Sequence, residues 1–356
     1  MSAAELLDGR RVLICAGAGG VGKTTTAASL ALGAAIQGAK VAVVTIDPAR
    51  RLANALGLDE LGNQPSRIDP ERLGTDCAGE LWAMMLDPKR TFDDLIDAVA
   101  PGPERAAEIK SNRIYRQLST AVAGSQEFTA VAKLYELNRS GSYDLIVLDT
   151  PPSRNALDFL DAPDRLETFL EGRTMKSFLA PAGIGMRVFA IGAAPVLGAL
   201  RRVTGVDVVS ELMAFFGLLG GMTEGFRARA KQVDALLHDS QTGFVLVSSP
   251  QARSIEEAIW FRRELDQHAL PLAGAIVNRV HPRAQSGEPP AGLTAQLAAK
   301  LAQAVAEHDA LAEHDAQGVA RLREALGDAP LLLVPELPGD VHDVQGLLRM
   351  RQELFG

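Results

Sequence analysis

The feature that most constrains the fold of this chain is a glycine-rich loop that joins an apolar run to a helical pattern. Residues 11–16 (RVLICA) are predicted as a strand, residues 23–38 as a helix, and residues 40–46 (KVAVVTI) as the next strand. An apolar run this short, entering a glycine-rich turn, is typical of a parallel strand covered on both faces. Strand, loop, helix and strand form a βαβ unit, which predicts a parallel sheet with helices on its faces.

Four more short apolar runs extend this predicted sheet, at residues 143–148, 243–248, 273–278 and 330–334. Helical patterns lie between them. Strands that alternate with helices build a doubly wound, mostly parallel sheet. The predicted fold class is therefore α/β, with strands drawn from distant parts of the chain. The glycine-rich loop occurs once, which predicts one site per chain.

A helical insertion interrupts the alternation of strands and helices. Residues 164–238 are rich in Leu, Phe, Ala, Gly and Met and follow a helical period. We predict a helical subdomain there, between an N-terminal part (1–163) and a C-terminal part (239–356) of the α/β domain. The N-terminal part carries a further helical segment at about 91–138, with a helical stretch predicted over residues 111–138 before the strand at 143–148.

A linker and a long helix are predicted near the C-terminus. Residues 286–292 are rich in Gly, Pro and Ser, as connecting segments are. Residues 293–327 follow a polar, alanine-rich helical pattern. The linker therefore separates the strand at 273–278 from one long helix.

Composition excludes several classes of protein. The chain has 356 residues, 47% of them hydrophobic and 22% charged, which rules out a disordered or low-complexity chain. A net charge of −8 and only 5% aromatic residues argue against a nucleic-acid partner. Residues 1–10 lack a secretory signal, and the most apolar stretch, 178–200, contains two prolines and an arginine. We expect a cytoplasmic protein with at most peripheral membrane association.

The glycine-rich loop fits the phosphate-binding pattern G-x-x-x-x-G-K-T from residue 17 onward. Glycines let successive backbone N–H groups surround a phosphate, and the helix that follows adds its positive N-terminal dipole. Lys23 would bridge the β- and γ-phosphates, and Thr24 would ligate Mg²⁺. The fold is therefore predicted to be a P-loop NTPase that binds ATP or ADP with Mg²⁺. The predicted binding residues are Gly17, Ala18, Gly19, Gly20, Val21, Gly22, Lys23, Thr24 and Thr25.

Two further loops follow apolar strands at the strand ends where α/β sheets bind ligands. Asp149, in LDTPPS, fits a Mg²⁺-holding role. Asp47, in TIDPARRL, would lie near the γ-phosphate and the metal, where it could orient or deprotonate the attacking water. The alternative for Asp47 is a cap on the next helix, since Asp-Pro is a common helix start.

The chain resembles the ArsA family, also called the arsenical pump-driving or anion-transporting ATPases, through GAGGVGKTTTAASLAL, TIDPARRLANALG and LDTPPSRNALDFLDAP. The family includes the eukaryotic ATPase that guides tail-anchored membrane proteins. The resemblance continues through FVLVSSPQARSIEEAIWF, IVNRV and VPELPGDVHDVQGL, and is strongest to actinobacterial Get-like ATPases that work as paralogue pairs. It implies a deviant Walker A ATPase that dimerises with two nucleotides at the interface.

The resemblance also implies roles for single residues. Asp47 would activate water, and Asp149 would begin the second switch segment. Asn278 would read the edge of the adenine, for which its amide offers both a donor and an acceptor. The loop at Pro335 would cover the base. The alternative for Asn278 is a turn residue after its strand.

One position departs from the pattern that the resemblance implies. The group normally carries a lysine where this chain has Ala18, and that lysine reaches the phosphates of the partner subunit. The isolated chain would then hydrolyse ATP slowly, or a paralogue would supply the lysine in a heterodimer. Three arginines in the switch loops are candidate substitutes, and a solvated basic face is the alternative for them: Arg50, Arg51 and Arg154.

The cysteine content sets limits on metal chemistry. Cys15 and Cys77 are the only two cysteines. No C-x-x-C pair is present for a zinc-bridged dimer, and the thiolate set for arsenite is absent, so we expect neither site. Cys15 is predicted to be inert in the core.

The helical insertion offers apolar area that could bind a hydrophobic protein client. Met and flexible glycine-rich segments suit surfaces that repack around varied partners. The alternative is that these residues form the core of the subdomain or a dimer interface. They are Phe178, Met186, Val188, Phe189, Ile191, Leu197, Leu200, Leu212, Met213, Phe215, Phe216, Leu218, Leu219 and Met222.

Two functions remain in competition at this point. The first is an ATPase that couples nucleotide state to the binding of a partner or client, as a homodimer or a heterodimer. The second is a non-hydrolysing, nucleotide-binding regulatory subunit whose paralogue performs the chemistry. Ala18 favours the second, whereas Asp47, Asp149 and the intact Lys23-Thr24 pair favour the first. A DNA-partition ATPase conflicts with the acidic charge, and a small-molecule kinase conflicts with the switch loops.

Overall fold

The computed structural model describes residues 2–47, 49–113, 115–116, 126–150, 218, 222–284 and 293–356. The chain divides into two compact units. The first comprises Met1–Leu86, Leu137–Leu157 and Leu237–Gly356, and the second comprises Asp87–Glu136 and Asp158–Leu236. Because residues 151–217 lie outside the described residues, the boundaries of the helical insertion stay a prediction.

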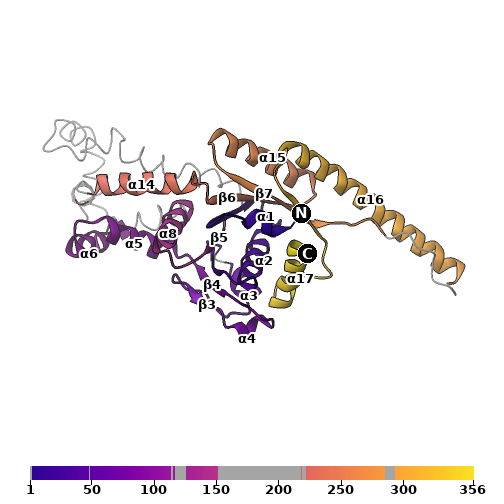
Figure 1. Ribbon diagram of the computed structural model, residues 1–356, viewed down its shortest axis with the longest axis horizontal. Coiled ribbons are helices and arrows are strands. Elements are labelled where there is room, and N and C mark those ends of the chain that lie inside the picture. The colour runs from indigo at the N-terminus through magenta and orange to yellow at the C-terminus, as the bar shows by residue number, and fades with distance from the viewer. Residues whose placement is uncertain are drawn as a thin grey trace, which may run out of the picture. The chain divides into compact units, whose positions relative to one another are not determined.

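The first unit is built on one eight-stranded sheet, ordered β3-β4-β2-β5-β1-β6-β7-β8. All neighbouring strands are parallel except β3 and β4. The predicted α/β class with a mostly parallel sheet is therefore confirmed (Figure 1). The strands are β1 (Val12–Gly17), β2 (Lys40–Thr45), β3 (Ser66–Arg67), β4 (Glu80–Met85), β5 (Leu145–Asp149), β6 (Thr242–Ser248), β7 (Leu272–Val280) and β8 (Leu331–Pro335).

Strands β3 and β4 were not predicted from the sequence. Strand β4 pairs with β2 on one side, and on the other it has only two residues of β3 as a neighbour. Its side chains alternate between buried and partly exposed, with Trp82 and Glu80 on the more exposed positions. A strand near the edge of a sheet does not need the continuous apolar run by which the central strands were found.

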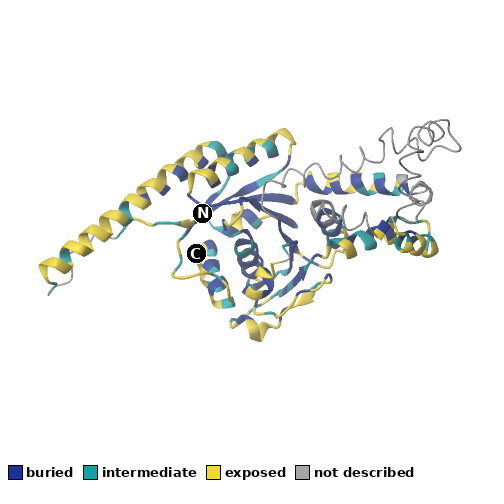
Figure 2. Cartoon of the chain, turned by 180° about the vertical axis from the view of Figure 1, so that it is seen from behind, coloured by how far each residue is buried: buried dark blue, intermediate teal, exposed yellow. Residues whose placement is uncertain are grey.

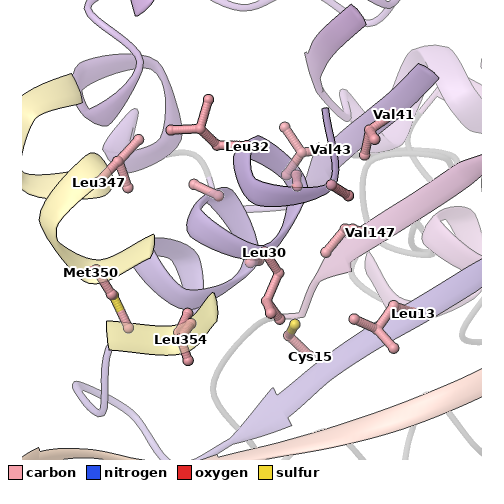
Figure 3. Close-up of a cluster of buried hydrophobic side chains, with 14 of the residues drawn as sticks. Leu13, Cys15, Leu30, Leu32, Val41, Val43, Val147, Leu347, Met350 and Leu354 are labelled. Atoms are coloured by element: carbon pink, nitrogen blue, oxygen red, sulfur yellow. The ribbon is translucent and has the colours of Figure 1, made fainter. Parts of the chain in front are cut away.

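Seven helices accompany the sheet among the described residues of the first unit: α1 (Ala3–Leu7), α2 (Lys23–Ile36), α3 (Arg51–Ala55), α4 (Pro70–Leu73), α15 (Ala252–Gln267), α16 (Ala295–Leu326) and α17 (Val344–Phe355). The core lies between the sheet and helices α2 and α17 (Figure 3). In that core Leu30 of α2 lies beside Cys15 of β1, and Leu347 and Met350 of α17 lie on the other side of α2. Helix α2, which begins just after the loop at the end of β1, is therefore covered on both sides.

The helix predicted over residues 293–327 is α16, which ends at Leu326 with Gly327 as its C-cap. Its C-terminal half buries Ala312, Leu322 and Leu326 against the unit. Its N-terminal half is exposed, apolar positions such as Leu297 and Leu301 included (Figure 2). The linker predicted before it, 286–292, lies outside the described residues. No helix of the described residues has the length and apolarity needed to cross a bilayer.

The described part of the second unit is helical, with α5 (Pro88–Val99), α6 (Pro103–Ser111), most of α8 (Gln126–Ser140) and most of α14 (Thr223–Leu237). Within the helical stretch predicted over residues 111–138, α8 begins at Gln126, and Asn112 has an extended backbone just after the end of α6 at Ser111. The Asn112 side chain accepts a hydrogen bond from the Tyr115 N–H, which favours a new turn over continuation of α6.

Two of the apolar residues considered for a client surface fall within the described residues. Leu218 and Met222 are buried in a small core with Leu95, Ile96 and Phe226. For these two the alternative interpretation, the core of the helical unit, therefore holds. The remaining members of that set, 178–216 and 219, lie outside the described residues.

Candidate functional site

The glycine-rich loop connects β1 to α2 and depends on two glycines for different reasons. Gly22 has φ 94°, a left-handed conformation that side chains rarely adopt. A Cβ atom at Gly22 would also overlap the amide nitrogen of Asn278. At Gly17 a Cβ atom would overlap the backbone oxygen of Val247 on the adjacent strand β6. The loop can therefore follow this path only with glycine at these positions.

Lys23, the first residue of α2, directs its ammonium back into the loop. Its Nζ donates to the backbone oxygens of Gly17 and Ala18, at 2.9 and 2.8 Å. The side chain is 7% exposed, and burial lowers the pKa of the ammonium while the nearby Asp149 carboxylate opposes that shift. A buried cation held only by carbonyl oxygens is a strong binding point for an anion.

Asp149 stands at the end of β5, where the register places it beside both Cys15 of β1 and Thr45 of β2. Its Oδ2 atom accepts hydrogen bonds from the hydroxyls of Thr24 at 2.7 Å and Thr45 at 2.8 Å. Its Oδ1 atom is buried without a hydrogen-bond partner among the described residues. Burial raises the pKa of Asp149 to about 6, against the two hydroxyl bonds that lower it.

The unpartnered Oδ1 atom of Asp149 and the hydroxyl of Thr24 fit a Mg²⁺ ion, which prefers hard oxygen ligands. No group of three or more His, Cys, Asp or Glu side chains suited to a metal occurs in the part of the chain that the structure describes. Mg²⁺ commonly completes its shell with water and substrate phosphates, so a site with few protein ligands is normal for this ion.

Asp47 follows β2 and lies in the same cavity. Its Oδ1 atom accepts a hydrogen bond from the Ala49 N–H at 2.9 Å, and its Oδ2 atom lies 3.6 Å from Nε of Arg51. Helix α3 begins after Arg50, and no side chain caps it by a hydrogen bond. Asp47 therefore does not cap α3, which was the alternative role considered for it.

The cavity has a volume of about 680 Å³ and two walls. The P-loop wall consists of Gly20, Gly22, Lys23, Thr24, Thr25, Asp47, Arg51, Asn54, Ala55 and Thr150. The β7–β8 wall consists of Asn278, Arg279, Glu336, Leu337, Gly339, Asp340, Val341 and His342. Met350 of α17 also lines the cavity.

Asn278 lies within β7 and touches the glycine-rich loop. Its Nδ2 atom donates to the backbone oxygen of Val21 at 3.0 Å, and the side chain is 8% exposed. The amide therefore braces the loop, a contact that the sequence analysis did not predict. Reading of adenine by Asn278 stays a prediction. Pro335 ends β8 and is not among the residues that line the cavity, whereas the residues directly after it are.

The structure thus brings Lys23, Thr24 and Asp47 to one cavity, and the buried Asp149 bonds to Thr24 behind its wall, while their chemical roles stay predictions. The side chains of Ala18 and Val21 instead pack into the hydrophobic core. Sequence reasoning missed Thr45, whose hydroxyl is bonded to Asp149. Its only signal was its place at the C-terminal end of a predicted strand. The candidate Arg154 lies outside the described residues.

The two cysteines occupy different environments. Cys15 is buried in β1, and burial raises the pKa of its thiol well above the ordinary range. A thiol held in its neutral form is a poor nucleophile and metal ligand, in agreement with the prediction of an inert core residue. Cys77 is partly exposed and its Sγ atom contacts the Gly79 oxygen at 3.6 Å.

Known proteins resemble this chain over most of its length. The family model described as anion-transporting ATPase matches residues 10–291. The protein named ATPase get3 of Aspergillus terreus is 28% identical over 274 residues, 76% of this chain and 73% of its own length. ATPase GET3 of Podospora anserina is 28% identical over 279 residues, 78% and 75% of the two chains. ATPase ARSA1 of Chlamydomonas reinhardtii is 25% identical over 304 residues, 76% of this chain but 35% of that relative.

Proposed function

Because this chain belongs to the anion-transporting ATPase family, we propose that it binds ATP with Mg²⁺ in the described cavity and hydrolyses it to ADP and phosphate. We further propose that the nucleotide state controls binding of a partner. The observation that carries the proposal is that Lys23, Thr24 and Asp47 line one cavity beside the glycine-rich loop, with the buried Asp149 carboxylate bonded to Thr24. Each part of that arrangement would serve a separate step of phosphoryl transfer.

Binding would begin with the ammonium of Lys23. In the structure it donates to two loop oxygens. The β- and γ-phosphates are charged acceptors, and charge-assisted hydrogen bonds are stronger than those to neutral carbonyls. The ammonium would therefore turn from the loop oxygens to the phosphates. Backbone N–H groups of the loop and the N-terminal end of α2 would add further donors.

The two carboxylates would have separate tasks. Thr24 and Asp149 would hold Mg²⁺, which would neutralise phosphate charge when bound. Asp47 has one oxygen engaged by the Ala49 N–H, while its Oδ2 atom lies 3.6 Å from Nε of Arg51. The Oδ2 atom would accept a proton from water as the water oxygen bonds to the γ-phosphorus. The bond from that phosphorus to the bridging oxygen breaks, and its electron pair remains on ADP.

A second candidate function is a nucleotide-binding regulatory subunit that does not hydrolyse ATP. The observation that favours it is Ala18, which is 7% exposed and packs in the hydrophobic core, so position 18 supplies no cation. A paralogue carrying lysine at the corresponding position would then supply it in a heterodimer. For the ATPase, a homodimer is the simplest assembly, and an apolar protein segment bound by the helical unit is the proposed client.

Phosphate release by the purified full chain tests the proposal. We expect Mg²⁺-dependent release from ATP without an added acceptor, which also separates hydrolysis from a kinase reaction. The Asp47→Asn chain should still bind ATP but release phosphate at least about 100-fold more slowly, since it lacks the base. ATP binding without turnover, restored by a paralogue, would favour the regulatory subunit. Failure of calorimetry to detect ATP binding would refute both.

A further inference from the structure

The P-loop wall contains a second cation besides Lys23. Arg51 is the first residue of α3, and its side chain lines the cavity together with Lys23, Thr24 and Asp47. Arg51 lies close enough to Lys23 that its charge contributes to the lowered pKa of the ammonium. Two cations held near each other beside an open cavity form a site for a multiply charged anion.

The contact that Arg51 makes is one that an incoming phosphate can replace. Its side chain is 66% exposed, and Nε lies 3.6 Å from Oδ2 of Asp47. Exposed ion pairs of this kind contribute little to stability. Arginine binds phosphate oxygens through paired hydrogen bonds, which are stronger than a single long contact to a carboxylate. The positive charge of Arg51 does not stabilise α3 either, because a cation in the first turn of a helix opposes the helix dipole.

We propose that Arg51 binds the γ-phosphate of ATP within the same chain and, in doing so, releases Oδ2 of Asp47 to accept a proton from water. This inference rests on the proposed ATP hydrolysis and names a further residue for it. ADP has no γ-phosphate, so with ADP bound Arg51 keeps its ion pair with Asp47. After attack by water on the γ-phosphorus, the bridging bond breaks and its electrons stay on ADP. Arg51 would balance the charge that develops on the γ-phosphate oxygens during this step.

The neighbouring arginine supplies a matched control. Arg50 precedes α3, is exposed, and is not among the residues that line the cavity. Its φ of 57° is left-handed, so the control replacement is Arg50→Asn, because asparagine tolerates that conformation. Both replacements remove one positive charge from adjacent residues, and a general charge effect would be the same for both.

The experiment measures ATP turnover and the affinities for ADP and a non-hydrolysable ATP analogue in the full chain. We expect Arg51→Gln to lower kcat by at least about 10-fold, a modest share of what arginines contribute in related P-loop sites. The affinity for the ATP analogue should fall by several-fold, with the affinity for ADP unchanged. Arg51→Lys should recover part of both losses, and Arg50→Asn should match the unmodified chain.

Two results would overturn the inference alone. One is an Arg51→Gln chain with unchanged turnover, and the other is an equal loss of affinity for the ATP analogue and ADP, as expected if Arg51 only steadies Asp47. If the unmodified chain binds ATP without turnover, the affinities still test whether Arg51 binds the γ-phosphate. Arg51→Gln should then weaken binding of the ATP analogue but not of ADP. Only if it binds no ATP do the inference and the proposed function fail together.

Discussion

The two walls of the cavity differ in how their polar groups are held. On the P-loop wall, Lys23 is buried and bonded in place, and Thr24 is bonded to the buried carboxylate of Asp149 behind it. On the β7–β8 wall, Arg279, Glu336 and His342 are exposed, and only Asn278 is buried. The P-loop wall rests on the central strands and α2, whereas the β7–β8 wall is formed largely by the segment after an outer strand.

This difference indicates which wall should contribute more of the free energy of nucleotide binding. Buried, bonded groups do not have to be ordered when a ligand arrives, so their interactions are fully available to it. Exposed side chains must lose conformational freedom and water first. We therefore expect the P-loop wall to dominate affinity and turnover, and the β7–β8 wall to contribute less. The four predictions below test this ranking.

Lys23→Ala should have the largest effect. Loss of the ammonium removes charge stabilisation from the reacting phosphates, and we expect kcat/KM for ATP to fall by about 10³-fold. Lys40→Ala is the control, because the side chain of Lys40 is 41% exposed and pairs with Glu80 at the far end of β2. Phosphate release measures both. A Lys23→Ala chain with more than a tenth of the original activity would contradict the ranking.

Asp149→Asn should be next, with about 100-fold slower Mg²⁺-dependent turnover. It should also change how stability depends on pH. The pKa of Asp149 is raised to about 6, so between about pH 4 and pH 6 the folded chain holds a proton that the unfolded chain has lost. Without nucleotide and Mg²⁺, the free energy of unfolding should therefore fall as pH rises through this interval, by at most ~3 kcal/mol.

Urea unfolding at pH 4.5 and pH 7 in chelator measures this pH dependence. The Asp149→Asn chain should show a smaller fall between the two pH values, and at pH 7 it should be the more stable of the two chains. If both chains lose the same free energy of unfolding, the buried carboxyl does not titrate in this interval.

Asn278→Ala should have an intermediate effect that is equal for ATP and ADP. The replacement removes the hydrogen bond to the Val21 oxygen and leaves that buried acceptor unpaired, at a cost of about 1–3 kcal/mol in the free energy of unfolding. A looser loop should weaken both nucleotides several-fold, since both carry the β-phosphate. Calorimetry with ATP analogue, ADP and GDP adds a sharper test. A selective loss for adenine nucleotides would assign base reading to Asn278.

Glu336→Gln should have the smallest effect, under about twofold in kcat and KM. Its side chain is 53% exposed, and its Oε2 atom lies 3.8 Å from Nε2 of His281. Exposed pairs of this kind contribute little. A tenfold change in either constant would show that the β7–β8 wall participates in the reaction and would break the ranking of the two walls.

The sequence by itself determined the central part of this protein. The apolar runs predicted β1, β2, β5, β6, β7 and β8, and the spacing of glycines, Lys23 and Thr24 predicted the phosphate loop between β1 and α2. These features are readable because they are local. A buried parallel strand needs an unbroken apolar run, and a left-handed turn such as that at Gly22 needs glycine.

Only the tertiary structure decided which distant residues meet. Asp149 bonds to Thr24 and Thr45, which lie 125 and 104 positions away, because β5 lies between β1 and β2. Asn278 braces the loop from β7, two strands from β1. Of the adjacent Arg50 and Arg51, which look alike in sequence, only Arg51 lines the cavity. Strand order, strand register and the different positions of two adjacent residues set these contacts, and no local sequence pattern encodes them.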